Sequence, residues 1–330
     1  MLTNASQDVL APIKRVMDRH GACCSPEEFH AAVNVTFHNF EAEVYDREHS
    51  DMWKSLPREI YRLANDCAEA AGGQHDLSLL DIGCGTGLAT HCLLKSGLAA
   101  RIKSIELLDT SRSMLKQAEK RVAGWNRPFT INEGLIEDLP KGRKYSLIIS
   151  CSVLHHVPDL EVFLRTVRSL QADAGMYIHL QDPNADYSSD PEFLQRLAKI
   201  KSKRQLPEVM YRFSPTRVFR RIYREVTGKQ HQNYCAKTNR ELLNVGLIAT
   251  PLSIAELYSI TDIHVLDGAG ISVRRMKKWM PDYELISVRS YGFWGRLWSE
   301  LPSRLKKLED ELAGSKTLNG MHVGAVWKLR

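Results

Sequence analysis

The chain has 330 residues, more than one typical domain, with 43% hydrophobic and 25% charged residues and a formal net charge of +6. This composition is that of an ordinary soluble protein, and the mild positive charge does not by itself indicate a nucleic-acid partner. The seven cysteines lack zinc-site spacing and their odd number argues against a disulfide framework, so we expect a reducing cytoplasm. No apolar stretch reaches the length of a membrane span, and residues 1–10 lack a basic-then-apolar signal pattern.

Residues 1–76 are expected to form helices that act as a lid on the rest of the chain. Residues 9–20 have apolar side chains at helical spacing, and Ser25, followed by a proline and two glutamates, is a typical helix start. Residues 39–50 are polar with aromatic side chains interleaved. This pattern fits a solvated amphipathic helix as well as it fits part of a lid. Residues 53–71 predict the helix that leads into the first strand.

The short apolar run of residues 77–82 is followed directly by turn residues and therefore predicts a buried strand. An acid near its end is followed by glycines at three alternate positions, and glycine lets a ligand approach the main chain. Residues 88–98 then have apolar side chains at helical spacing. A strand, a glycine turn and a helix form the nucleotide-binding geometry of a doubly wound sheet. The acid and the glycines are Asp81, Gly83, Gly85 and Gly87.

The spacing of these residues separates two kinds of cofactor. A dinucleotide site has G-x-G-x-x-G, whereas this turn reads G-x-G-x-G with an acid two residues before it. A carboxylate that faces the ligand suits a cationic group better than a pyrophosphate. Residues 81–87 resemble motif I, D-x-G-x-G-x-G, of the class I S-adenosylmethionine (SAM) methyltransferases and match it in full. The resemblance implies that the glycine loop, Cys84 included, holds the methionine part of SAM while Asp81 helps to hold its amino group.

The second expected strand, residues 101–108, is followed by Asp109, an acid placed to accept both ribose hydroxyls. The segment that follows resembles the family's D-x-S-x-x-M-L and implies that Thr110 and Met114 also contact the cofactor. Tyr45 lies earlier, in a segment that loosely resembles the A-x-x-Y-D lid of many small-molecule methyltransferases. The resemblance therefore implies a cofactor contact for Tyr45 as well.

The adenine end of the site departs from the family pattern. After the third expected strand, residues 129–132, the family reads G-D-A-x-x-L-P, and its acid bonds the adenine amino group. This chain has Leu135 in that place. Adenine would then depend on apolar packing and on backbone groups near Leu135 and Ile136, or on Glu137 or Asp138 as a substitute acid.

The fourth expected strand, residues 145–151, ends at Cys151, and the resemblance places the reactive methyl group just beyond it. Residues 153–159 read V-L-H-H-V-P-D and resemble the ubiquinone-biosynthesis-like branch of the family, which acts on small molecules. The [DNS]-P-P-[YFW] tetrad of enzymes that methylate nucleic-acid amino groups does not occur there. His155 and His156 are candidate general bases because imidazole titrates near neutrality, although such a pair often only shapes the pocket.

A helix over residues 160–170 precedes the fifth expected strand, residues 175–181. That strand ends at Asp182, which opens onto the same cleft and is a further candidate base. A turn role for the Asp-Pro-Asn sequence fits equally well. His179 and His38 complete the set among which we would look for a base.

Residues 185–262 contain no strand-like run and are expected to form a helical insertion. The resemblance to the methyltransferases implies that this insertion binds the substrate. Residues 196–224 contain ten basic residues and one acid, which suits a solvated helix face or an anionic partner such as a carboxylate, a carrier-bound acyl group or RNA. Aromatic side chains interleave with these residues and would line a pocket or pack the helices. They are Tyr211, Phe213, Phe219, Tyr223, His231 and Tyr234.

Residues 263–330 are expected to complete the core. They predict a helix over residues 272–280, a strand over 283–291, a charged helix over 302–312 and a last strand over 321–329. The resemblance to the family implies that the two strands pair as an antiparallel hairpin. The long connection between them is of a kind that often serves function or subunit contacts, which leaves a homodimer open.

The sequence therefore predicts an α/β protein with a doubly wound, Rossmann-like sheet of seven strands whose core begins with residues 77–184. The resemblance implies a SAM-dependent methyltransferase that yields S-adenosylhomocysteine (SAH) and methylates an O, N or C nucleophile of a small, anionic or aromatic molecule. In-line transfer would need proximity and at most one base. The alternatives are a tRNA or protein methyltransferase and a non-methylating SAM-binding scaffold or sensor. No metal site is predicted, because the His, Asp and Glu residues lack ligand spacing.

Overall fold

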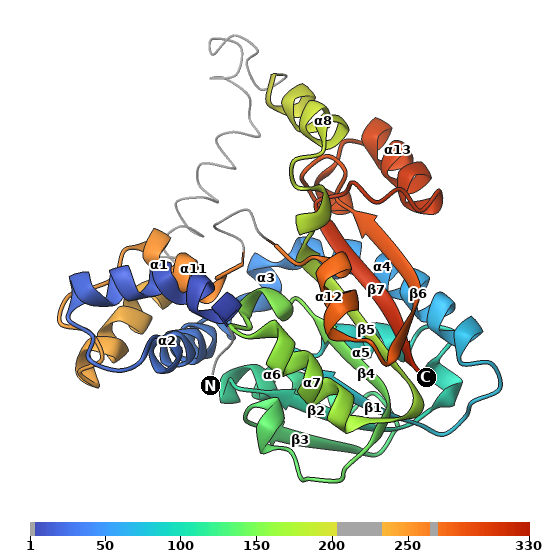
Figure 1. Cartoon of the computed structure of the whole chain (residues 1–330), viewed down its shortest axis with the longest axis horizontal. Coiled ribbons are helices and arrows are strands. Elements are labelled where there is room, and N and C mark those ends of the chain that lie inside the picture. Colours follow the sequence, from blue (N-terminus) through green and yellow to red (C-terminus); the bar gives the residue numbers. More distant parts are fainter. Residues whose placement is uncertain (1–3, 203–232, 265–269) are drawn as a thin grey trace.

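A computed structural model gives the fold of residues 4–202, 233–264 and 270–330, which are the residues that the structure describes (Figure 1). Seven strands build its sheet. They are β1 (Leu77–Ile82), β2 (Ile102–Asp109), β3 (Phe129–Glu133), β4 (Tyr145–Cys151), β5 (Gln171–Pro183), β6 (Tyr283–Tyr291) and β7 (His322–Leu329). Their order across the sheet is β3-β2-β1-β4-β5-β7-β6.

The strands β1 to β5 run parallel, whereas β7 runs antiparallel to both of its neighbours, β5 and β6. The carboxyl ends of the parallel strands therefore meet at one edge, where ligands bind in doubly wound folds. The predicted α/β fold with seven strands and a C-terminal antiparallel hairpin is confirmed.

The helices surround this sheet and extend beyond it. Those with described bounds are α1 (Asn4–His20), α2 (Pro26–Glu41), α3 (Tyr45–Glu48), α4 (Ser50–Ala70), α5 (Leu88–Leu93), α6 (Arg112–Val122), α7 (Leu160–Leu170), α8 (Pro191–Ser202), α11 (Ile254–Thr261), α12 (Val273–Trp279) and α13 (Ser303–Gly314). Residues 233–244 are also helical. The helix α2 begins with a capping box, in which Ser25 and Glu28 bond each other's backbone N–H groups.

Two element boundaries differ from the sequence expectations. The helix α5 ends at Leu93 instead of residue 98. The Ser96 hydroxyl donates a hydrogen bond to the Leu93 carbonyl at 2.7 Å and so competes with the backbone bond that would continue the helix. The strand β5 begins at Gln171 instead of residue 175, because Gln171 pairs with Tyr145 across the sheet. Residues 171–174 read Q-A-D-A and contain no large apolar side chain from which a strand could be predicted.

Both faces of the sheet are covered by buried apolar side chains. On one face, α4, α5 and α6 pack against the sheet through residues such as Leu56, Leu93 and Leu115. On the other face, α7 and α12 pack against it through residues such as Leu164 and Met276. The sheet is therefore a rigid support for the loops at its edge.

A third apolar cluster lies outside the sheet and joins α1, α2, α11 and residues 233–244 (Figure 1). Its members include Phe29 and Phe37 of α2, Tyr234, and Leu257 and Ile260 of α11. We call these four helical segments the cap. The predicted boundaries of the lid (1–76) and the insertion (185–262) stay predictions, and the cap combines residues from both, whereas α4 packs on the sheet.

Most of the predicted basic run lies outside the described residues, as do five of its six aromatic residues, Tyr211, Phe213, Phe219, Tyr223 and His231. At its described start, Arg196 is not part of a solvated face. Its guanidinium donates to the backbone carbonyls of Phe293 and Asn319, at 3.0 and 2.9 Å, and so ties α8 to the C-terminal segment. Within the described ranges, no helix has the length and apolar character to cross a membrane.

Candidate functional site

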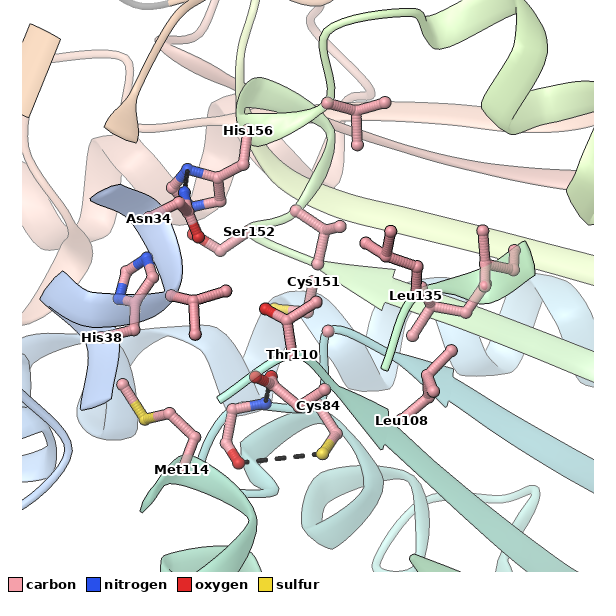
Figure 2. A pocket seen from close by; sticks show the side chains of 18 of the residues that line it. Asn34, His38, Cys84, Leu108, Thr110, Met114, Leu135, Cys151, Ser152 and His156 are labelled. Carbon is pink, nitrogen blue, oxygen red and sulfur yellow. Dashed lines mark hydrogen bonds between the residues drawn. The ribbon is translucent and has the colours of Figure 1, made fainter. Parts of the chain in front are cut away.

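A cavity of about 770 Å³ lies between the cap helix α2 and the carboxyl ends of β1, β2 and β4 (Figure 2). Eleven of the twelve predicted cofactor contacts line it: Tyr45, Asp81, Gly83, Cys84, Gly85, Asp109, Thr110, Met114, Leu135, Ile136 and Cys151. The twelfth, Gly87, caps α5 with φ of 87°, and a side chain there would meet Trp125. Gly87 therefore shapes the turn instead of the cavity wall.

Asp81 is completely buried at the cavity wall, near the end of β1. Its Oδ2 accepts the Thr90 hydroxyl at 2.6 Å and the Thr90 N–H at 3.3 Å. Its Oδ1 has no hydrogen-bond partner among the described residues. Burial raises the pKa of Asp81 to about 7, against the effect of the Thr90 bonds. A cationic group in the cavity would satisfy Oδ1 and stabilise the charged carboxylate.

The first two glycines of the loop, Gly83 and Gly85, serve different purposes. At Gly83, a Cβ would lie 2.5 Å from the Val153 side chain, so the loop can approach the end of β4 only without one. At Gly85, a Cβ would meet nothing within 4 Å, which leaves open space beside the backbone. Both have positive φ, +62° and +53°. The Gly85 side of the loop is thus a surface on which a ligand can lie directly.

Asp109 is held in a fixed orientation at the end of β2. Its Oδ2 accepts the Gly85 N–H and its Oδ1 accepts the Ser111 N–H, both at 2.8 Å. Each carboxylate oxygen has a further lone pair for a ligand donor. Burial raises the pKa of Asp109. The Ser111 hydroxyl donates to Asn39 of α2 at 2.7 Å, so this strand end is also attached to the cap.

In the loop after β3, two of the groups expected to serve adenine bond each other. The Leu135 N–H donates to Asp138 Oδ2 at 2.8 Å. This bond occupies the Leu135 backbone donor and one oxygen of Asp138, which was one of the two acids expected to bond adenine. Leu135 is 55% exposed, whereas Ile136 is buried. Glu137 lines the cavity and is the acid of this loop that a ligand can reach.

Asp46 of α3 attaches the segment around Tyr45 to the glycine loop. Its carboxylate accepts the Thr86 hydroxyl at 2.6 Å and the Trp53 indole N–H at 2.9 Å, and it also bonds Arg121. Trp53 in turn lies under the Arg121 guanidinium, 4.4 Å from the ring centre. These contacts fix Tyr45 at the cavity wall.

The predicted bases are not equally placed. His155 and Asp182 form a buried pair, with His155 Nδ1 2.8 Å from Asp182 Oδ1, and neither lines the cavity. His179 also lies away from it, fully buried in β5, and burial lowers its pKa to about 4. His156 does line the cavity, and its Nδ1 donates to the Thr261 carbonyl at 2.7 Å. Burial holds the pKa of His156 well below the usual value.

Three side chains near this point have the composition of a metal site. Ligand atoms of His155, His156 and Asp262 lie within 4.8 Å of one another, which the sequence spacing did not reveal. However, the Nδ1 atoms of both histidines already bond Asp182 and Thr261. These bonds favour a hydrogen-bonded network that joins the end of β4 to the end of α11.

The cavity wall contributed by α2 was largely missed by sequence reasoning. Asn34 and His38 line it, as does His49 of the following turn, and Glu41 lies behind the two histidines. Figure 2 shows the imidazoles of His38 and His156 at one end of the cavity, and their ring centres are 5.4 Å apart. The signal was a histidine three residues before a glutamate on one helix face, which by itself is common.

Comparisons with known proteins agree on one domain. Residues 80–177 match the family model described as a methyltransferase domain. A highly reducing polyketide synthase of Aspergillus niger is 30% identical over 130 residues, which cover 34% of this chain and 5% of that protein. The malonyl-[acyl-carrier protein] O-methyltransferase of Priestia megaterium is 30% identical over 137 residues, 42% of this chain and 46% of that one. The chain thus spans less than half of the length of either relative.

Among solved structures, the plantazolicin methyltransferase BpumL in complex with SAH covers 92% of this chain and 97% of its own, with 11% identity and a TM-score of 0.48. A SAM-dependent methyltransferase of Methanococcus maripaludis, called putative in its description, covers 43% and 63%, with 24% identity and a TM-score of 0.36. The family-model match runs from β1 into β5, the strands whose ends form the cavity. Residues 80–177 of this chain therefore form a methyltransferase domain by similarity to the family model.

Proposed function

We propose that the protein binds SAM in this cavity and transfers its methyl group to a small-molecule nucleophile. The observation that carries the proposal is the arrangement of Asp81, Gly85 and Asp109 on one wall. A buried carboxylate oxygen without a donor, an uncovered stretch of backbone and an oriented carboxylate match the ammonium, chain and ribose diol of SAM. The cavity volume of about 770 Å³ also lies within the range of small-molecule sites, roughly 300–1,000 Å³.

The residues present fit each part of the cofactor. Asp81 would hold the amino group, the glycine loop the methionine chain, and Asp109 the ribose hydroxyls, while Leu135 and Ile136 would pack against adenine. When bound, SAM supplies a reactive methyl carbon on a sulfonium. What the chain itself contributes is orientation and the exclusion of water, because α2 covers the strand ends.

The remainder of the cavity suggests the kind of acceptor. Val35 of α2, and Val157, Val162 and Phe163 beyond β4, give it an apolar side. An aromatic or acyl group would pack there, with its nucleophilic atom toward the histidines at the end of β4. The similarity to a malonyl-carrier-protein methyltransferase and to polyketide synthases makes acyl thioesters natural acceptors to test.

The test is methyl transfer from tritium-labelled SAM to a phenol, to acyl thioesters and to total tRNA, in parallel. Incorporation into a small molecule but not into tRNA supports the proposal. Incorporation into tRNA alone would favour a macromolecular substrate. SAM binding without transfer to any acceptor would favour the scaffold or sensor alternative.

A further inference from the structure

We propose that His38, oriented by Glu41, is the general base of the methyl transfer, and that the acceptor therefore carries a proton on its attacking atom. This inference rests on the proposed function. It narrows the acceptors to compounds such as a phenol or an activated carbon acid. From the set of bases expected from the sequence, it selects the one that the cap contributes.

The geometry is that of a base with its orienting carboxylate. His38 lines the cavity, and its Nδ1 lies 3.3 Å from Oε2 of Glu41, which is only 3% exposed. The other oxygen, Oε1, lies 3.1 Å from Nε2 of His49. Because Nδ1 of His38 faces the carboxylate, Nε2 is the nitrogen that can accept a proton. No described residue provides a hydrogen-bond partner for this Nε2.

The position of His38 relative to the reacting centre is also suitable. Its ring lies edge to face with that of His156, which follows the end of β4 (Figure 2). Asn34, one turn earlier on α2, reaches the same histidine, with Nδ2 3.5 Å from its Nδ1. His38 thus faces the place beyond Cys151 where the methyl group is expected. The base would thus be carried by the cap, whose helix α2 lines the cavity.

His156 is the rival candidate and is less suited. Its Nδ1 donates to the neutral Thr261 carbonyl at 2.7 Å and lies 3.4 Å from Asp262, a carboxyl whose pKa is raised by burial. His38 instead bonds Glu41, whose pKa is low. A carboxylate stabilises the imidazolium that forms when a base takes up a proton, and a carbonyl does so less. The pKa of His156 is consistent with this ranking, because burial holds it well below its usual value and so makes His156 a weaker base.

Electrostatics support the assignment of His38. Burial alone lowers its pKa, but the bond to Glu41 and the charge of Glu41 outweigh burial, so the pKa of His38 is raised. Burial would raise the pKa of Glu41, yet its bonds to both histidines bring the pKa down to about 2. Glu41 is therefore ionised at neutral pH. The other titratable groups that face His38 are His30, His49, Asp109, His156 and Asp262.

The step balances without another reactant. His38 Nε2 takes the proton from the acceptor's O–H or activated C–H. The electron pair left on that atom forms the bond to the methyl carbon, and the pair of the broken C–S bond stays on sulfur. The products are the methylated acceptor, SAH and an imidazolium, which returns its proton to water. A carboxylate acceptor, already ionised at neutral pH, would not need this base.

The first experiment measures methyl transfer to three acceptors. They are 4-methylumbelliferone (a phenol), acetoacetyl-N-acetylcysteamine (a carbon acid) and malonyl-N-acetylcysteamine (a carboxylate). We expect His38→Gln to lower transfer to the phenol or the carbon acid by roughly 10²–10⁴-fold, with SAH affinity unchanged within about twofold. The matched control is His20→Gln. His20 also pairs with a glutamate in the cap, Glu256 at 3.2 Å, but it does not line the cavity.

Glu41→Gln separates a chemical role of the pair from a structural one. Loss of its charge should lower the pKa of His38, so the rise of kcat/KM with pH should move to lower pH. Merely looser packing would lower the rate without this displacement. A second experiment needs no methyl acceptor. It is an NMR titration of ¹³C-labelled histidine rings, in which the His38 signal is identified by its loss in His38→Gln. This signal should titrate above the usual range in the wild type and lower in Glu41→Gln.

The outcomes are distinct. Full transfer by His38→Gln to a protic acceptor, transfer to the carboxylate acceptor alone, or a His38 signal insensitive to Glu41→Gln would each overturn the assignment. The coupled titration without transfer to any acceptor would support the His38–Glu41 pair and count against the proposed function instead.

Discussion

At the scale of single residues, Asp81 combines a cost to folding with a proposed role in binding. A carboxyl whose pKa is raised to about 7 in the folded state holds its proton longer than in the unfolded state. The folded state is thus favoured at low pH, and this advantage is lost as the pH rises from about 4 to about 7. The proposed role of Asp81, which is to meet the cationic amino group of SAM, would account for this cost.

Asp81→Asn should therefore have opposite effects on stability and on binding. It removes a buried charge but can keep the Thr90 bonds, so the ligand-free protein should gain on the order of 1 kcal/mol or more of unfolding free energy at pH 8. It should lose SAH affinity by about tenfold or more. Urea unfolding at pH 5 and pH 8, with calorimetry, measures both. A stability gain at pH 5 as large as at pH 8 would contradict the explanation.

The glycine loop allows a paired substitution. Gly83→Ala brings a Cβ into the Val153 side chain at positive φ and should destabilise the fold by about 1–3 kcal/mol. Gly85→Ala meets no neighbour, so it should cost only about 1 kcal/mol, yet its methyl group should obstruct SAH. Denaturant unfolding and calorimetry distinguish the two. Equal stability losses would argue against the close contact at Val153.

Residues at strand ends were predictable, because a strand followed by a turn determines where Asp81 and Asp109 point. The histidines were not. Two adjacent histidines after β4 must point in different directions, and only packing decides that His155 turns to Asp182 and His156 to the cavity. The pairing of His38 with His49 across Glu41 depends on the turn between two helices, which no local pattern specifies.

At the scale of elements, Asp46 connects α3 to the glycine loop through its bond to the Thr86 hydroxyl. Asp46→Ala removes the acceptor of Thr86, Trp53 and Arg121 together. We expect faster amide exchange over residues 42–53 and about three- to tenfold weaker SAH binding, with little change in global stability. The control is Glu43→Gln, an exposed acid of the same segment. Unchanged exchange over that segment in Asp46→Ala would show that other contacts hold α3.

The strands of the core followed from apolar runs, whose alternative as helices was excluded by their length and by flanking turn residues. The start of β5 did not, because Gln171 joins the sheet through pairing with Tyr145 and through its amide, which donates to the Met176 carbonyl at 2.9 Å. Such pairing is a tertiary effect.

At the scale of the whole molecule, the cap that lies beside the sheet is built from two stretches of chain that are far apart in sequence. Phe37 of α2 packs edge to face on both Tyr234 and Tyr258, at 5.3 and 5.5 Å between ring centres. Sequence order separates these residues by about two thirds of the chain, so boundaries drawn along the sequence could not anticipate one cap. The core domain could be anticipated, because its motifs follow each other in sequence.

The cap covers one side of the cavity and is attached to the sheet. Asn39 of the cap bonds Ser111, and Asp46 of the neighbouring helix α3 bonds Thr86. Cofactor binding and the placement of the cap are therefore coupled through the same loops. Occupation of the cavity by SAH should protect both sides from amide exchange.

The most direct measurement is calorimetry of SAM and SAH binding to the wild type, to Asp109→Ala and to Asp76→Ala. Asp76 is exposed at the opposite end of β1 and is the control. We predict micromolar binding that Asp109→Ala weakens at least tenfold, or roughly 1.4 kcal/mol, and that Asp76→Ala leaves unchanged. No binding of SAM or SAH by the wild type would contradict the account.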